Sequence, residues 1–284
     1  MELALQELPL AIFTTLAPIG AGAFVLLALA FALKEFSAEQ LKKIDKLTAI
    51  PLILVIIGFA AAFIHLADPL HAPWALSGIG SSPLSNEIAV GSLFVVVSVV
   101  YWVLACMGKL DNGARKPYAI VLAVVAVIFA CFTGLAYYVD TIASWATIAL
   151  PVSIIGFSLA GGALLGSLIV SCAVGDGGGL SKIGKSAIIL IMIGAVLGII
   201  GACGQYAVAA GILTPMTNGA AMASAVTGYL VAAIVLIVLG AAAGIYALAK
   251  GFKTGMLASG FILIIVAVFI ARLVFYALRI SVGL

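Results

Sequence analysis

The sequence predicts an all-α, polytopic integral membrane protein with eight transmembrane helices and both termini on the outer side. Three observations predict this fold class. Of the 284 residues, 65% are hydrophobic and 8% are charged, whereas a soluble domain is about 45–50% apolar and about 25% charged. Eight apolar runs approach or exceed the roughly 20 residues that a helix needs to cross a bilayer. The basic residues fall in alternate connections between these runs.

The predicted spans follow one another with short connections, so residues 1–284 are expected to form a single membrane domain. The spans cover residues 8–33, 49–66, 87–107, 118–139, 147–174, 185–213, 221–250 and 254–278. The span 8–33 is expected to be a true span and not a cleaved signal peptide, because it is too long for one. Glu2 and Glu7 also stand where a signal peptide would carry basic residues.

The later spans carry two kinds of sequence signal: polar residues typical of a helix start, and closely spaced small residues. Ser85 and Asn86 precede Glu87, a pattern typical of the start of a helix. A faint likeness between IIGFAAAFIHL in the second span and MIGAVLGIIGA in the sixth fits a four-plus-four internal repeat. The fifth, sixth and seventh spans contain glycines four residues apart, which predict close helix contacts within the chain: Gly162–Gly166, Gly194–Gly198 and Gly240–Gly244.

The charges indicate how the spans are oriented. Eleven of the 13 lysines and arginines follow the first, third, fifth and seventh spans, and the other two, Arg272 and Arg279, lie near the C-terminus. Loops rich in Lys and Arg face the cytoplasm, so these four connections are predicted to be cytoplasmic. The eleven are Lys34, Lys42, Lys43, Lys46, Lys109, Arg115, Lys116, Lys182, Lys185, Lys250 and Lys253.

Composition and spacing exclude several classes of function. A net charge of +3 without a basic stripe argues against nucleic-acid binding. The cysteines form no CxxC pair, have no histidine at ligand spacing and are expected to be small buried residues. They cannot hold an iron–sulfur cluster in this pattern. The four are Cys106, Cys131, Cys172 and Cys203.

Haem and metal are also not expected in this protein. A membrane cytochrome with two b-type haems needs four axial histidines, and the sequence has two, His65 and His71. His71 lies between Pro69 and Pro73 in a connection, a poor place for an axial ligand. No phosphate-binding loop, dinucleotide fingerprint or nucleophile elbow is present.

Ionisable residues near one end of the spans are the main functional candidates, because such groups are costly to keep in a membrane. The predicted topology brings them together on the outer side from distant parts of the sequence. They are His65, Asp68, His71, Glu87, Asp140 and Arg272.

Each candidate also has a structural interpretation. A charged His65 at the end of a helix, and Glu87 in a first turn, are both favoured by the helix dipole. Asp140 fits a solvated charge at a helix end. Arg272 lies inside a span, so it needs a partner or must extend outward to water.

Other polar and aromatic residues fit structural roles. Gln205 is expected to hydrogen-bond between helices. An outer aromatic belt is predicted from Trp74, Trp145, Tyr137 and Tyr138.

Three segments resemble a known family. HLADPLHAPWALSGIGSSPLSNEI, residues 65–88, is similar to the signature of the membrane anchor subunits of anaerobic dimethyl sulfoxide reductases, the DmsC family. The starting segment LPLAIFTTLAPIGAGAF and the final segment RLVFYALRISVG resemble the first and last spans of that family. The resemblance thus covers the whole sequence.

The resemblance implies a role in anaerobic respiration in the cytoplasmic (inner) membrane of a prokaryote. Such anchors hold a molybdopterin catalytic subunit and an iron–sulfur electron-transfer subunit, carry no haem, and oxidise menaquinol. They pass the electrons to the iron–sulfur subunit and do not reduce the terminal substrate themselves. The family implies that His65 and Glu87 bind the quinol, and Arg272, Asp68 and His71 are candidates for supporting that site.

Two departures from the family pattern affect these candidates. Relatives often carry arginine where this protein has His71, which is expected to alter contacts with a partner. Some relatives have a glutamate one turn before the arginine of the last span, and this protein has Val268 there. Arg272 therefore lacks the neighbour that the family pattern implies.

The residues leave other functions open. One is a related eight-span, quinone-linked subunit of a polysulfide- or nitrite-reductase-type complex. Another is a secondary transporter with a site between two four-helix halves, although no carboxylate lies in the middle of a span. A third is a haem-bearing cytochrome b subunit.

Overall fold

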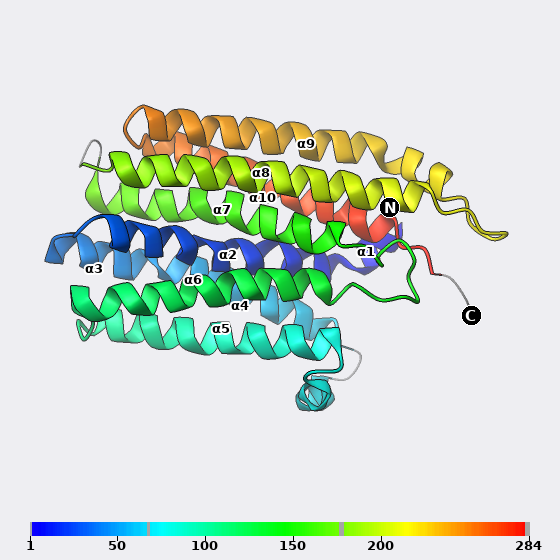
Figure 1. Ribbon diagram of the computed structural model, residues 1–284, viewed down its shortest axis with the longest axis horizontal. Helices are drawn as coiled ribbons and strands as arrows, with labels where there is room; N and C mark the ends of the chain where they lie inside the picture. The colour runs from blue at the N-terminus through cyan, green and yellow to red at the C-terminus, as the bar shows by residue number, and fades with distance from the viewer. Residues whose placement is uncertain (1, 67–68, 176–178, 282–284) are drawn as a thin grey trace.

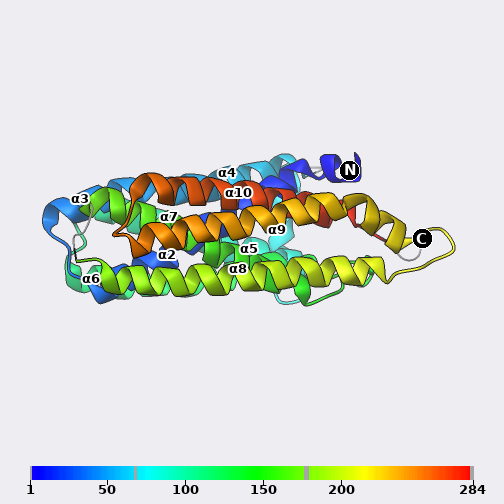
Figure 2. The same ribbon diagram turned by 90° about the horizontal axis from the view of Figure 1, so that it is seen from above.

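The computed structural model describes residues 2–66, 69–175 and 179–281, and its long helices lie side by side along one axis (Figure 1, Figure 2). Within these ranges eight helices are long and apolar enough to cross a membrane, as predicted. They are α2 (Leu8–Leu33), α3 with α4 (Ala38–Leu47, Ala49–Ile64), α5 (Pro83–Cys106), α6 (Asn112–Leu135), α7 (Ala149–Val174), α8 (Ser181–Ala210), α9 (Gly219–Ala249) and α10 (Thr254–Ala277). Two short helices, α1 (Glu2–Gln6) and η1 (Pro69–Gly78), lie outside the spans.

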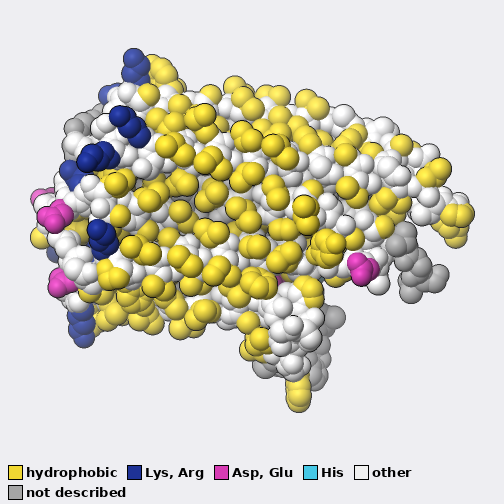
Figure 3. Space-filling view, in the orientation of Figure 1, with side chains coloured by type: hydrophobic (Ala, Val, Ile, Leu, Met, Phe, Trp, Pro, Cys, Tyr) yellow, Lys and Arg dark blue, Asp and Glu magenta, His cyan; other side chains and the backbone are white. Residues whose placement is uncertain are grey.

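The two ends of the bundle differ in charge. Lysines and arginines gather at one end, here called the basic end (Figure 3). This end contains the connections 34–37, 107–111 and 250–253 and the start of α8. The opposite end, here called the terminal end, contains α1, the end of α10 and η1 (Figure 1). This separation matches the alternation of basic connections in the sequence.

The two helix starts that lie furthest before the predicted residues are capped by polar side chains. Asp111 accepts a hydrogen bond from the backbone N–H of Ala114 at 2.7 Å, so α6 begins at Asn112 and not at residue 118. Ser37 and Gln40 form a reciprocal capping box at the start of α3. The predicted basic connection after the first span is therefore largely helical.

The helices form two groups of four with the same pattern of neighbours. In the first group α2 packs on α4 and α6, and α5 packs on α6 and, more sparsely, on α4. In the second group α7 packs on α8 and α10, and α9 packs on α10 and α8. The groups meet mainly through α2 and α7, whose apolar windows are 67% and 78% buried, more than those of the other spans.

Small residues allow α2 and α7 to lie this close. A Cβ at Gly22 would lie 2.0 Å from the carbonyl oxygen of Ser158, and one at Gly162 would lie 2.2 Å from the carbonyl carbon of Gly22. Ser158 also donates a hydrogen bond from Oγ to the carbonyl oxygen of Pro18 at 2.6 Å. The predicted role of glycine in contacts within the chain is confirmed here.

Two predictions about side-chain burial are wrong. Arg115, expected to be an ordinary residue of a cytoplasmic connection, is 2% exposed and forms an ion pair with Asp45 of α3. None of the cysteines is buried: two are exposed, two are half-buried and all four are free. A membrane helix presents apolar residues outward as well as inward, so apolar sequence around a cysteine does not predict burial.

Candidate functional site

The predicted site residues that the structure describes lie at the terminal end. His65 is the C-cap of α4, Glu87 lies in the second turn of α5, and Arg272 lies on α10 just before its end. Asp140 is exposed in the connection after α6. Asp68 and the side chain of His71 lie outside the described residues.

Arg272 is the largest of the fully buried side chains among the described residues, with 1% of its surface exposed. Its Nε donates a hydrogen bond to Thr14 Oγ1 at 2.8 Å, and Thr14 donates in turn to the carbonyl oxygen of Leu10 at 2.7 Å. Its Nη2 donates to Tyr276 Oη at 3.4 Å. The arginine therefore finds partners inside the bundle and does not extend to water.

Aromatic rings surround the Arg272 guanidinium. Its central carbon lies 4.1 Å from the ring centre of Phe275, 5.1 Å from Tyr276 and 5.5 Å from Tyr137, distances at which cation–π attraction operates. Trp145 stacks on Phe275 at 5.0 Å. Tyr137 and Trp145 are thus buried in this interior cluster. The prediction that these two residues belong to an outer aromatic belt is therefore wrong.

Glu87 is the second buried charged group at this end, with 4% of its surface exposed. Its Oε1 is fully buried and has no hydrogen-bond partner, and the same holds for Thr133 Oγ1 on α6. Arg272 lies close enough for its charge to act on the Glu87 carboxyl, but no ion pair joins these two described side chains. Glu87 is thus an acidic residue near Arg272, whereas position 268, one turn earlier on α10, is a valine.

An aromatic cluster lies between the first four spans, one helical turn after Glu87 along α5. A Cβ at Gly91 would lie 2.4 Å from the ring of Phe59 and 2.8 Å from that of Phe129, so glycine lets these rings approach α5. Phe59 and Phe94 each stack against Phe129, with ring centres 5.7 and 6.0 Å from it. The buried carboxyl therefore lies next to flat apolar surfaces.

His65 has a separate set of partners. Its Nε2 lies 3.1 Å from Glu7 Oε2, and Arg279 Nη1 lies 3.0 Å from Glu7 Oε1. The His65 side chain is 35% exposed. Glu7 thus ties the end of α4 to the end of α10, a role that the sequence interpretation missed. The sequence contained one signal for these contacts. Glu7 directly precedes the first span on the predicted outer side, and His65 and Arg279 were expected on that side too.

His65 and Glu87 therefore belong to two adjacent polar groups. His65 lies at the surface with Glu7 and Arg279, and Glu87 lies in the interior with Thr133 and Arg272. Both occupy the same end of neighbouring helices in the first group of four.

A small cavity extends the interior polar region beside Arg272. Its polar lining consists of Ser153, Gln205 and Arg272. Gln205 is buried, and its Nε2 has no hydrogen-bond partner. The interhelical hydrogen bond predicted for Gln205 therefore does not come from its amide nitrogen.

The chemistry of this end is that of hydrogen bonding and proton exchange. Within the described residues no group of three His, Cys, Asp or Glu side chains could hold a metal ion. A buried carboxyl with a free oxygen can accept a proton or a hydrogen bond from a ligand, and histidine can do so near neutral pH.

Comparisons with known proteins agree over nearly the whole sequence. A family model described as DMSO reductase anchor subunit (DmsC) matches residues 1–278. The protein is 32% identical over 282 residues to a subunit of the anaerobic dimethyl sulfoxide reductase of Escherichia coli, covering 98% of this sequence and 97% of that subunit. It is 34% identical over 145 residues to the Haemophilus influenzae subunit of the same name, which covers 51% of this sequence and 52% of that subunit.

Proposed function

The chain belongs to the DMSO reductase anchor subunit family, and we propose that it anchors such a reductase in the membrane and oxidises menaquinol. In this proposal residues 1–284 act as one domain in the cytoplasmic membrane of a prokaryote. The basic end faces the cytoplasm, and the terminal end faces outward. Its partners are an iron–sulfur electron-transfer subunit and a molybdopterin catalytic subunit, as the names of its relatives suggest.

The buried, unpaired Oε1 of Glu87 is the observation that carries the proposal. Oxidising a quinol releases two electrons and two protons, so a site needs groups that bind the ring oxygens and accept the protons. A carboxylate oxygen without a partner is costly inside a protein unless a ligand or water satisfies it. A quinol hydroxyl that donates to this oxygen would supply the missing hydrogen bond.

The surroundings of Glu87 fit a flat aromatic ligand. The rings of Phe59 and Phe129 lie beside the turn of α5 that follows Glu87. Because α4 meets α5 only sparsely while packing closely on α2, a lipid-soluble quinol can approach between α4 and α5. We propose that the quinol ring enters there and that its hydroxyl reaches Glu87.

His65 and Arg272 take supporting roles in this mechanism. His65, at the surface end of α4, binds the second ring oxygen or receives a proton, and Glu7 orients its imidazole from 3.1 Å away. Arg272 compensates the negative charge of Glu87 in the interior. The two electrons leave to the iron–sulfur subunit, and the protons leave at the terminal end.

The test compares two electron donors for the assembled complex. Quinol-driven turnover requires this site, whereas an artificial dye that reduces the iron–sulfur subunit directly does not. His65→Arg and Glu87→Lys should abolish the first and preserve the second, while Glu39→Gln, an exposed acid at the basic end, should preserve both. Normal quinol-driven turnover in the two site variants would overturn the proposal.

A further inference from the structure

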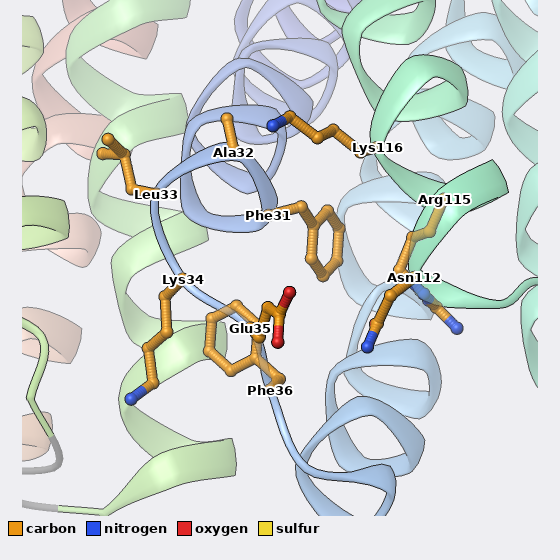
Figure 4. Close-up of a pocket in the computed structure, with 9 residues that line it drawn as sticks. All are labelled: Phe31, Ala32, Leu33, Lys34, Glu35, Phe36, Asn112, Arg115 and Lys116. Atoms are coloured by element: carbon orange, nitrogen blue, oxygen red, sulfur yellow. The ribbon is translucent and has the colours of Figure 1, made fainter.

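A cavity at the basic end lies apart from the proposed quinol site. It has a volume of about 200 Å³ and lies between the end of α2, the segment that follows it and the start of α6 (Figure 4). Its lining combines apolar and charged side chains from both sides: Phe31, Ala32, Leu33, Lys34, Glu35, Phe36, Asn112, Arg115 and Lys116.

The cavity has an excess of positive charge. Lys34, Arg115 and Lys116 line it, and Glu35 is the one acidic side chain in its lining. Arg115 is held in place by bonds to other elements. It forms an ion pair with Asp45 of α3, donates to the carbonyl oxygen of Leu110 at 3.2 Å, and lies over the ring of Phe31 at 5.6 Å.

Arg115 also retains an unused donor. Its Nε is fully buried and has no hydrogen-bond partner, although the residue is only 2% exposed. An unsatisfied donor on a buried cation is costly, and an anion in the cavity would offset part of this cost through its charge, because Arg115 lines the cavity although its Nε atom is not exposed there. The burial of this cation thus adds to the case for a negatively charged ligand.

The rim of the cavity is apolar. Ala32 and Leu33 are exposed at the end of α2, where the first span ends. A ligand that occupies the cavity therefore meets cations inside and apolar surface at the rim. This combination suits a phosphate group attached to acyl chains better than a free anion, and basic pockets between membrane helices are known to bind acidic lipid head groups.

We propose that this cavity binds the phosphate head group of an anionic phospholipid, with Lys34, Arg115 and Lys116 around the phosphate. The lipid's glycerol and acyl chains then lie against Ala32 and Leu33. The site goes beyond quinol oxidation and does not depend on it. It would join the end of α2 to the start of α6 through one lipid at the basic end.

The test measures lipid binding to the purified full-length protein by native mass spectrometry. The probes are phosphatidylglycerol, cardiolipin, zwitterionic phosphatidylcholine and inorganic phosphate, each added alone. Lys116→Gln and Lys34→Gln remove charge from the cavity. Lys182→Gln removes the same charge from an exposed position of α8 at the same end. Arg115 is left intact because its ion pair with Asp45 supports the fold.

The expected result is tighter binding of the two anionic lipids than of phosphatidylcholine. Each cavity variant should weaken that binding about fivefold, since one basic residue near an anionic lipid surface contributes about that much. Lys182→Gln should leave the affinity for the anionic lipids within about twofold of that of the parent protein. Equal weakening by Lys182→Gln would overturn the proposal, as would equal binding of anionic and zwitterionic lipids. Inorganic phosphate that binds as tightly as the anionic lipids would show a free-anion site and reject the lipid.

Discussion

Arg272 and Glu87 are charged side chains that the fold removes from water at the terminal end. Removing a charge from water is costly unless other groups compensate it. Thr14, Tyr276 and three aromatic rings surround Arg272, and its positive charge acts on Glu87. We therefore expect the two charges to depend on each other.

Replacing Arg272 with leucine should be strongly destabilising. The variant loses the hydrogen bonds of the guanidinium to Thr14 and Tyr276, and each hydrogen bond of a charged group contributes about 1.5–3 kcal/mol. Arg279→Gln, at the exposed arginine that contacts Glu7, should cost less than about 1 kcal/mol. Unfolding of the full-length protein in mixed micelles by increasing denaturing detergent measures both values.

A double variant separates charge coupling from packing. If Arg272 compensates Glu87, then adding Glu87→Gln to Arg272→Leu should recover part of the lost stability, because no uncompensated charge remains. Strictly additive losses in the two variants would contradict this coupling.

At the scale of the elements, α2 and α7 form the centre of the bundle. Their contact depends on glycine, because Gly22 and Gly162 lie against backbone atoms of the opposite helix. In a membrane, helices are held together by close packing and hydrogen bonds instead of by the exclusion of water. The contact also joins the two groups of four helices.

Gly22→Ala should therefore weaken the whole fold. The added methyl group would lie 2.0 Å from the carbonyl oxygen of Ser158 and would force the helices apart, at a cost of about 1–3 kcal/mol or more. Gly228→Ala in α9 is the matched control, since nothing lies within 4 Å of its Cβ position. It should be neutral or stabilising by up to about 1 kcal/mol. Thermal unfolding of the two variants in the same detergent makes the comparison, and equal effects would contradict this account of the contact.

The α3–α6 ion pair should be the other strong link between elements. Asp45→Asn leaves Arg115 buried without its carboxylate, and we expect a loss of about 3–5 kcal/mol. The surface pair of Glu39 and Lys43 on the same helix is the control, and Glu39→Gln should cost about 0.3–0.5 kcal/mol. The measurement is the stability of each variant against detergent-induced unfolding. Equal losses of stability in Asp45→Asn and Glu39→Gln would contradict this role of the ion pair.

The sequence was sufficient for the spans because hydropathy and basic connections are properties of local segments. It was also sufficient to find the Glu87 and His65 region at one end. The links from His65 to Glu7 and from Asp45 to Arg115 were missed because each joins segments far apart in the sequence. Tyr137 and Trp145 were misplaced because an aromatic residue near a span end suits both a membrane interface and an interior cluster. The capping box of Ser37 and Gln40 was readable from spacing alone and was overlooked.

At the scale of the whole molecule, the separation of basic and terminal ends predicts the orientation in the membrane. A reporter active only in the cytoplasm should be inactive when fused after Leu284 and active when inserted in the connection 107–111, which belongs to the basic end. A reporter active only outside the cytoplasm should give the opposite result. Cytoplasmic activity of the fusion after Leu284 would reverse the proposed topology.

The central claim, that the terminal end binds quinol through Glu87, is tested most directly by equilibrium binding of a non-oxidisable quinol analogue to the assembled complex. Glu87→Gln should weaken binding about tenfold or more, because a hydrogen bond to a charged group contributes about 1.5–3 kcal/mol. Glu39→Gln should bind the analogue as tightly as the parent complex. Unchanged affinity in a stably assembled Glu87→Gln complex would contradict the account.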